Sequence, residues 1–138
     1  MMAMVQSSQF EIGLPVWTSS QTTIIGPSLS VTYLEEVNTD VGVGVFLKNY
    51  GSGVPEDIGS FFSMRGGSII GKPDGGDTTF DFLLGVGFGV DYFPHEKVSL
   101  GVEAQLNATK NDKNSGRFGR PGAIGVNTAA VIGLSIFF

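Results

Sequence analysis

The chain has 138 residues, which is most simply one domain. Only 15% of the residues are charged, well below the roughly 25% of average soluble domains, and 41% are hydrophobic. No run of about 18 apolar residues is present, so no membrane-spanning helix is available. The net charge of −5 argues against a nucleic-acid partner, and the absence of cysteine excludes disulfides, thiolate metal sites and cysteine nucleophiles.

The N-terminal residues 1–8 (MMAMVQSS) lack the basic region and the long apolar region of a signal peptide. Either the export signal is missing from this sequence or the protein is not exported by that route. We assign no strand to these residues and expect them to form a flexible N-terminal segment of the single domain over residues 1–138.

Alternation at period two predicts strands through the first half of the chain, whereas no stretch keeps a helical stripe for three turns. We expect strands over residues 9–17, 23–34 and 41–50, with an acidic turn over 35–40 and a loop over 50–59. Pro15 lacks an N–H for the ladder, so it is expected near a strand end or a bulge.

Residues 60–72 admit two interpretations, one strand bulged at Gly66 and Gly67 or two short strands around that pair. Further strands are predicted over 79–93, 98–109 and 123–138, separated by turns over 73–77 and 94–97 and by a polar loop over 110–122. The total is eight strands or seven. We expect eight; a count of seven would mean that a first strand is missing.

The segment 79–93 has two contrasting faces. One face is small or acidic at most positions, and the other is large and apolar throughout: Phe80, Phe82, Leu84, Val86, Phe88, Val90 and Tyr92. Such a face would promote aggregation in water but is ordinary against lipid, and Tyr92 and Phe93 fall where an aromatic girdle belongs. The pattern predicts an all-β, antiparallel up-and-down transmembrane β-barrel whose interior is filled by side chains.

The segment GVGFGVDYFPHEKVSLGVEAQLN (85–107) resembles the penultimate hairpin of small outer-membrane barrels of the OmpA-like and opacity-porin type. Such hairpins carry a Gly-rich strand, an aromatic pair, a short turn and an inward acid, here Glu103. The last strand, which ends in Phe138, resembles the C-terminal aromatic signal that these barrels present to the barrel-assembly machinery. The resemblance covers residues 60–138.

This resemblance implies a Gram-negative outer-membrane location and a non-enzymatic role in membrane integrity, surface interaction or adhesion through extracellular loops. Outer-membrane lipid, the assembly machinery and a host or other surface partner are the implied contacts. The main alternative is a soluble β-barrel that binds an apolar ligand, with Phe80, Phe82, Leu84, Val86 and Phe88 pointing inward.

With the small face inward, several polar side chains face the lumen, where charges must pair or meet water. We expect a structural polar plug in which Arg65 or Lys48 bridges to Glu103 or Glu11, and we keep a gated proton or ion path as the alternative. The full set is Glu11, Lys48, Arg65, Asp81, Asp91, Glu103 and Gln105.

Half of the eight basic residues lie in the loop over 110–122 or at its edge: Lys110, Lys113, Arg117 and Arg120. Lysine and arginine suit lipopolysaccharide phosphates, although a solvated loop explains them too. The single histidine, His95, lies in a predicted turn with no nucleophile marked nearby, so no catalytic set, metal site or cofactor is expected.

Overall fold

The computed structural model describes the backbone of residues 2–6, 9–18, 20–34, 38–51, 53, 56–72 and 76–137. It describes their side chains except those of 2–6, 9–11, 32–34, 38 and 39. Every regular element in this part of the chain is a strand: β1 (Met2–Gln6), β2 (Gln9–Gly13), β3 (Val16–Trp17), β4 (Thr23–Leu34), β5 (Asn38–Asn49), β6 (Ile58–Gly71), β7 (Thr79–His95), β8 (Val98–Lys110) and β9 (Ile124–Ile136). The described part of the chain contains no helix that is long and apolar enough to cross a membrane.

Elements β2 and β3 are two parts of one strand, because both pair antiparallel with β4 in a continuous register. The interruption falls at Leu14 and Pro15, where the Leu14 N–H still donates to the Pro27 carbonyl at 3.1 Å. The expectation for Pro15 is therefore confirmed. Counted this way, the described chain is an antiparallel up-and-down sheet of eight strands, as the sequence predicts.

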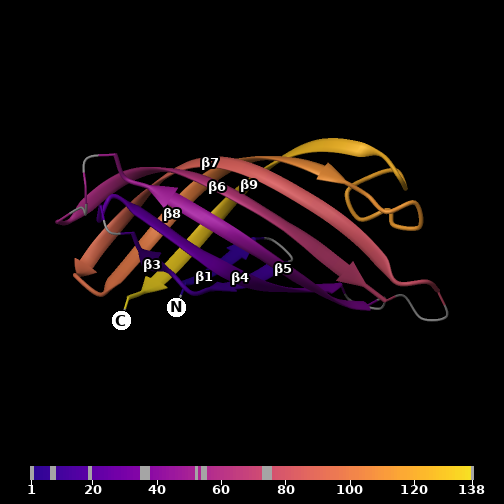
Figure 1. Cartoon of the computed structure of the whole chain (residues 1–138), viewed down its shortest axis with the longest axis horizontal. Coiled ribbons are helices and arrows are strands. Elements are labelled where there is room, and N and C mark those ends of the chain that lie inside the picture. The colour runs from indigo at the N-terminus through magenta and orange to yellow at the C-terminus, as the bar shows by residue number, and fades with distance from the viewer. Residues whose placement is uncertain are drawn as a thin grey trace.

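The strands pair with their neighbours along the chain, and β1 also pairs with β9 while β2 pairs with β4. Figure 1 shows the strands tilted and curved around an interior. The connections after β3, β5 and β7 and both ends of the chain gather at one end, which we call the turn end. The connections after β6 and β8 lie at the opposite end, the loop end.

The segment over 60–72 is one strand, because β6 pairs with β5 and β7 through Gly66 and Gly67 without a shift of register. The eighth strand is instead β1, in a segment to which the sequence analysis assigned no strand. The hairpin after β7 is also tighter than expected. Strand β7 continues to His95, so the turn is reduced to Glu96 and Lys97.

The two faces of the strands are oriented as predicted. In β7, Leu84 and Phe88 are each 63% exposed on the outer face, while Asp81 and Asp91 are each 1% exposed on the inner face. The exception is Phe93, which is 4% exposed and packs inside, so Tyr92 alone of that pair lies on the outer face. The alternative with Phe80, Phe82 and the following apolar residues inward is wrong, because all of them are exposed.

Glycines on the inner face leave room for large polar and aromatic side chains. A Cβ at Gly87 would overlap the Glu103 carboxylate, and one at Gly101 would overlap Asp91. A Cβ at Gly89 would overlap both the Phe61 ring and a backbone carbonyl oxygen of β8. The alternating glycines of β7 therefore provide the space into which the interior side chains of neighbouring strands extend.

We expect Gly89→Ala to lower the free energy of unfolding by about 1–3 kcal/mol, because the added methyl meets backbone that cannot move without distorting the ladder. Gly66→Ala is the control, since its Cβ would meet only ordinary contacts from 3.5 Å outward. Urea unfolding of the refolded chain, followed by the fluorescence of Trp17, measures both. Equal stability of the two variants would contradict this account of the β7 glycines.

Candidate functional site

The inner face of the sheet carries buried polar side chains along its length, beside a hydrophobic cluster that includes Phe46, Phe61 and Phe93. In β8 the inward side chains are all polar and buried: Ser99, Glu103, Gln105, Asn107 and Thr109. Burying polar groups is favourable only when they find partners. The candidate site is therefore this buried polar interior, which contains three groups of ion pairs.

The first group lies near the turn end and centres on Asp91. The Lys48 ammonium is 3.0 Å from the Asp91 carboxylate, and the Tyr50 hydroxyl donates to the same carboxylate at 2.5 Å. The Lys48 nitrogen also lies 4.0 Å from the centroid of the Phe61 ring, which adds a cation–π contact. Lys48 thus pairs with Asp91 rather than with Glu103 or Glu11, the partners expected from the sequence.

A cluster of aromatic rings closes the interior beyond Lys48 at the turn end. Trp17 lies 5.6 Å from both Tyr50 and Phe137 between ring centroids, and Phe93 lies 6.0 Å from Tyr50 and 6.3 Å from Phe137. These rings come from β3, from the residue after β5, from β7 and from the residue after β9. They exclude water from one side of the Lys48–Asp91 pair.

The second group lies in the middle of the interior, on Glu103. Arg65 lies 3.6 Å from the Glu103 carboxylate, as the sequence analysis expected. Ser63 and Gln105 donate to the same carboxylate at 2.5 and 2.9 Å. The Glu103 charge is thus neutralised by one cation and stabilised by two neutral donors.

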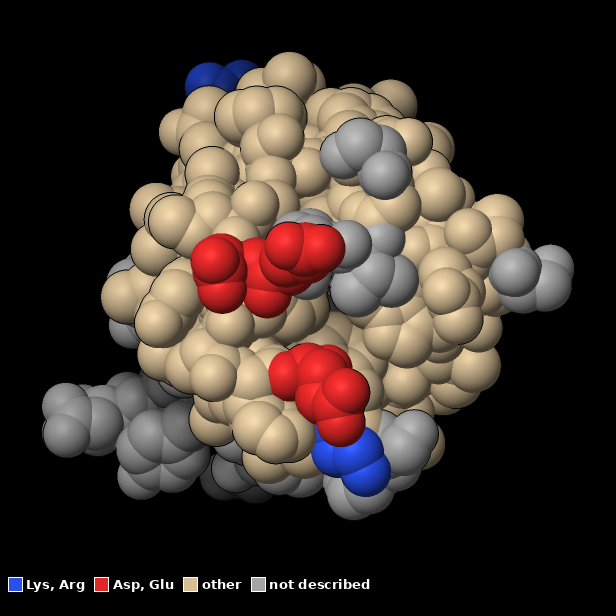
Figure 2. Space-filling view, turned by 90° about the vertical axis from the view of Figure 1, so that its left-hand side faces the viewer, with Lys and Arg blue, Asp and Glu red and all other residues tan. Residues whose placement is uncertain are grey.

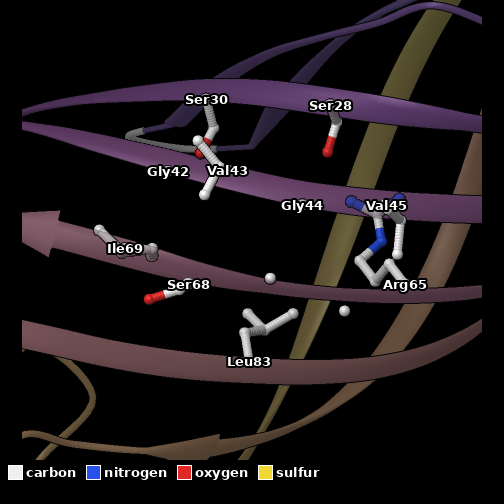
Figure 3. A pocket seen from close by; sticks show the side chains of 12 residues that line it. Ser28, Ser30, Gly42, Val43, Gly44, Val45, Arg65, Ser68, Ile69 and Leu83 are labelled. Carbon is white, nitrogen blue, oxygen red and sulfur yellow. The ribbon is translucent and has the colours of Figure 1, made fainter.

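A small cavity of about 40 Å³ adjoins Arg65. Figure 3 shows the Arg65 side chain extending from β6 across β5 toward β4, which carries Ser28 and Ser30, with Leu83 on the other side. Gly42 and Gly44 contribute backbone to the wall. A space of this size suits one or two water molecules rather than an organic ligand.

The third group lies at the loop end, on Asp81. The Asp112 N–H and the Ser115 hydroxyl donate to its carboxylate at 2.8 and 2.7 Å, and the Arg117 Nε lies 3.2 Å from it. Arg117 also forms an ion pair with Asp40, which is buried on β5. The segment between β8 and β9 is therefore tied down over the interior by its own side chains.

Four basic residues were expected to be exposed and to contact lipopolysaccharide. Arg117 is the exception, because its side chain turns inward. Its side chain is 14% exposed and engaged by Asp40 and Asp81, and burial lowers the pKa of its guanidinium from the usual value. Lys110, Lys113 and Arg120 are exposed at the loop end, where Lys110 donates to the Gly122 carbonyl at 2.8 Å.

Two predicted residues lie outside what the structure describes, namely the Glu11 side chain and Phe138. His95 ends β7, and its Nδ1 accepts a hydrogen bond from the Lys97 N–H at 3.2 Å, so it has a local role in the turn. Among the described side chains, no three His, Asp or Glu are grouped as a metal site would require.

Several members of the three groups were not predicted from the sequence. Asp40 was assigned to a turn, yet it has the same parity as Phe46 and Lys48 on β5, and that parity places it inside. Tyr50 follows the same rule. Ser115 and Arg117 lie in a loop, where no periodicity predicts which side chains turn inward.

The arrangement is suited to holding charge in place. Three cations and four carboxylates occupy the described interior, and each cation contacts a carboxylate directly. With aromatic rings at one end and the loop at the other, the interior is filled by ion pairs and by a hydrophobic cluster.

Comparisons with models of protein families, with curated proteins and with solved structures found no match to this chain.

Lys48→Met is expected to cost about 3–5 kcal/mol of unfolding free energy, because it leaves the buried Asp91 charge without a cation. The double variant Lys48→Met/Asp91→Leu should lose less than the single one, since neither charge then remains buried. Lys97→Met, on an exposed turn lysine, should stay within about 0.5 kcal/mol of the parent. A double variant less stable than Lys48→Met would show that the unpaired Asp91 charge is not the cause of the loss.

Arg117→Ala should release the segment over 111–123, because Asp40 and Asp81 lose their shared cation. We expect faster amide hydrogen exchange in that segment while exchange in β7 and β8 stays slow. Arg120→Ala removes the same charge from an exposed position and should leave exchange unchanged. Equal acceleration in both variants would mean that the loop is not held by Arg117.

Proposed function

We propose that this chain is a closed eight-stranded β-barrel that spans a bacterial outer membrane, a small non-enzymatic barrel of the OmpA-like or opacity-porin type. The observation that carries the proposal is the distribution of side chains between the two faces. Large apolar residues are exposed on the outside, and ion pairs are buried inside. That distribution suits a lipid solvent and a polar lumen.

Closure is supported by the path of paired residues around the sheet. From Gly125 on β9 the pairs run through Thr109, Leu83, Gly67, Gly44, Ser28, Gly13 and Met2 and return to β9 at Ser135. The return point lies ten residues farther along the same strand. Such a stagger is what tilted strands require in order to close, and β1 and β9 pair over Ile132 to Ser135.

The outer apolar surface has the height of a membrane. On β7 it runs from Phe80 to Tyr92, about 40 Å along the strand at ~3.3 Å per residue. A strand tilt of about 40° reduces this to roughly 30 Å, close to the hydrocarbon thickness. In the described strands, the one charged side chain of the outer face is Lys110, at the loop end of β8.

The two ends differ in charge, which suggests an orientation. Figure 2 shows acidic side chains near the middle of the turn end, where Glu56, Asp57 and Glu96 are exposed. The loop end carries the exposed cations Lys72, Lys110, Lys113 and Arg120 with the exposed acid Asp77, whereas Lys97 is the single exposed cation of the described turn end. We infer that the loop end faces outward toward lipopolysaccharide phosphates, and that the turn end faces the periplasm with both termini.

The filled interior favours a structural and surface role over transport. The ion pairs and the aromatic cluster occupy the space that a pore would need, so the exposed loops are the parts that meet other molecules. By its resemblance to small outer-membrane barrels, the chain would reach the membrane through the barrel-assembly machinery.

The test is gel mobility with and without boiling after the chain is refolded into detergent or lipid vesicles. A fast-migrating unboiled band with β-type circular dichroism is expected. Val86→Arg, near the middle of the outer face of β7, should weaken folding into vesicles by about 2–4 kcal/mol, whereas Asn114→Arg in the loop should not. A chain that folds in water without detergent, or an unaffected Val86→Arg, would contradict the proposal.

A further inference from the structure

The outer face of β6 to β9 contains two hollows between large apolar side chains. The loop-end hollow, of about 560 Å³, is lined by Ser68, Phe82, Leu84, Ala108, Lys110 and Ile124. The turn-end hollow, of about 510 Å³, is lined by Phe88, Val90, Val102, Ala104, Ala130 and Ile132. Both are shallow and open along the outer surface, so they suit an elongated chain lying on the strands rather than an enclosed small molecule.

Strand register explains why a hollow forms at the loop end. Gly66 pairs with Leu84, which pairs with Ala108, and Ser68 pairs with Phe82, which pairs with Lys110. Leu84 thus stands between small residues on both sides, and Phe82 stands between the small Ser68 and Lys110. The side chains of this surface are otherwise apolar, so water gains little there and a hydrocarbon chain gains contact.

The two hollows differ in one respect, because only the loop-end hollow has a cation at its rim. Lys110 is exposed, and its ammonium uses one of its three donors on the Gly122 carbonyl. The neighbouring Asp112 carboxylate accepts hydrogen bonds from the N–H groups of Phe80 and Asn114, which lower its pKa. Asp112 is thus held by the backbone, and Lys110 keeps two donors for a ligand.

We propose that the loop-end hollow binds a phosphorylated acyl lipid, with one acyl chain against Phe82, Leu84 and Ala108 and the phosphate on Lys110. This inference rests on the proposed membrane location, and it names a ligand for the loop end of the sheet. A lone cation beside an apolar surface complements a molecule with one anionic head and a hydrocarbon tail. Since the loop end faces outward in the proposed orientation, the lipid is the lipid A part of lipopolysaccharide.

The chain itself offers matched variants to test this. Lys110→Gln removes the cation, and Lys97→Gln removes the same charge at the turn end. Ala108→Phe fills the loop-end hollow, and Ala104→Phe fills the turn-end hollow on the same face of β8. Each refolded variant is first checked for the fast-migrating unboiled band and is then titrated with lipid A in detergent and examined by native mass spectrometry.

The parent chain is expected to retain one lipid A, and Lys110→Gln to bind it about fivefold more weakly, as loss of one surface lysine predicts. Ala108→Phe should lose the bound lipid, whereas Lys97→Gln and Ala104→Phe should retain it. If Ala108→Phe fails to fold, Lys110→Gln against Lys97→Gln decides the question.

Three outcomes would overturn the site. If Lys110→Gln binds lipid A with the same affinity as the parent chain, Lys110 does not contact the phosphate. If the parent chain retains phosphatidylglycerol as strongly as lipid A, the ligand is not specifically lipid A. A doubled mass that disappears in Ala108→Phe would make the hollow an interface between two copies of the chain. Failure of the parent to give the fast-migrating band would instead refute the membrane location.

Discussion

The neutralisation of buried carboxylates is the constraint on which the rest of this structure depends. Asp91, Glu103 and Asp81 sit inside the sheet at three levels, and each would be very costly to bury alone. Lys48, Arg65 and Arg117 satisfy them one by one. Because these cations come from β5, β6 and the loop after β8, the pairs tie together elements that are distant in the chain.

The small residues of the strands follow from the same constraint. Interior carboxylates and guanidinium groups need space, and the strand opposite them supplies it by having no side chain at Gly85, Gly87 and Gly89. Large apolar residues occupy the alternate positions of the same strand, where they point outward. Alternate residues of β7 therefore serve different faces of the sheet. The outer residues suit a hydrophobic solvent, and the inner glycines make room for polar side chains of the neighbouring strands.

Periodicity was enough to predict the facing of most residues, because one face of each strand is consistently larger and more apolar than the other. The bounds of β4 and the interruption at Pro15 were predictable for similar local reasons. The Arg65–Glu103 pair was also expected, but the partner of Lys48 was not, since Lys48 reaches Asp91 through a register that only the assembled sheet defines. Arg117 was unpredictable for another reason, because a loop has no period from which its direction can be inferred.

The segment over 60–72 shows how local signals mislead. Two adjacent glycines favour a bulge, yet Gly66 and Gly67 remain in register because they pair with Val45 and Gly44 on one side and with Leu84 and Leu83 on the other. The short β1 carries too little alternation to be recognised by itself. Its pairing with β2 and β9 identifies it as a strand.

The pairing of Met2 with Ser135 joins residues from the two ends of the chain. Hairpins such as β7–β8 need only local contacts and can form early, whereas this pairing must wait until almost all of the polypeptide is present. Until then the backbone edges of β1 and β9 have no mutual partner and are open to other chains. The seam between the first and last strands is therefore the pairing that has the largest separation along the chain and the one that closes last.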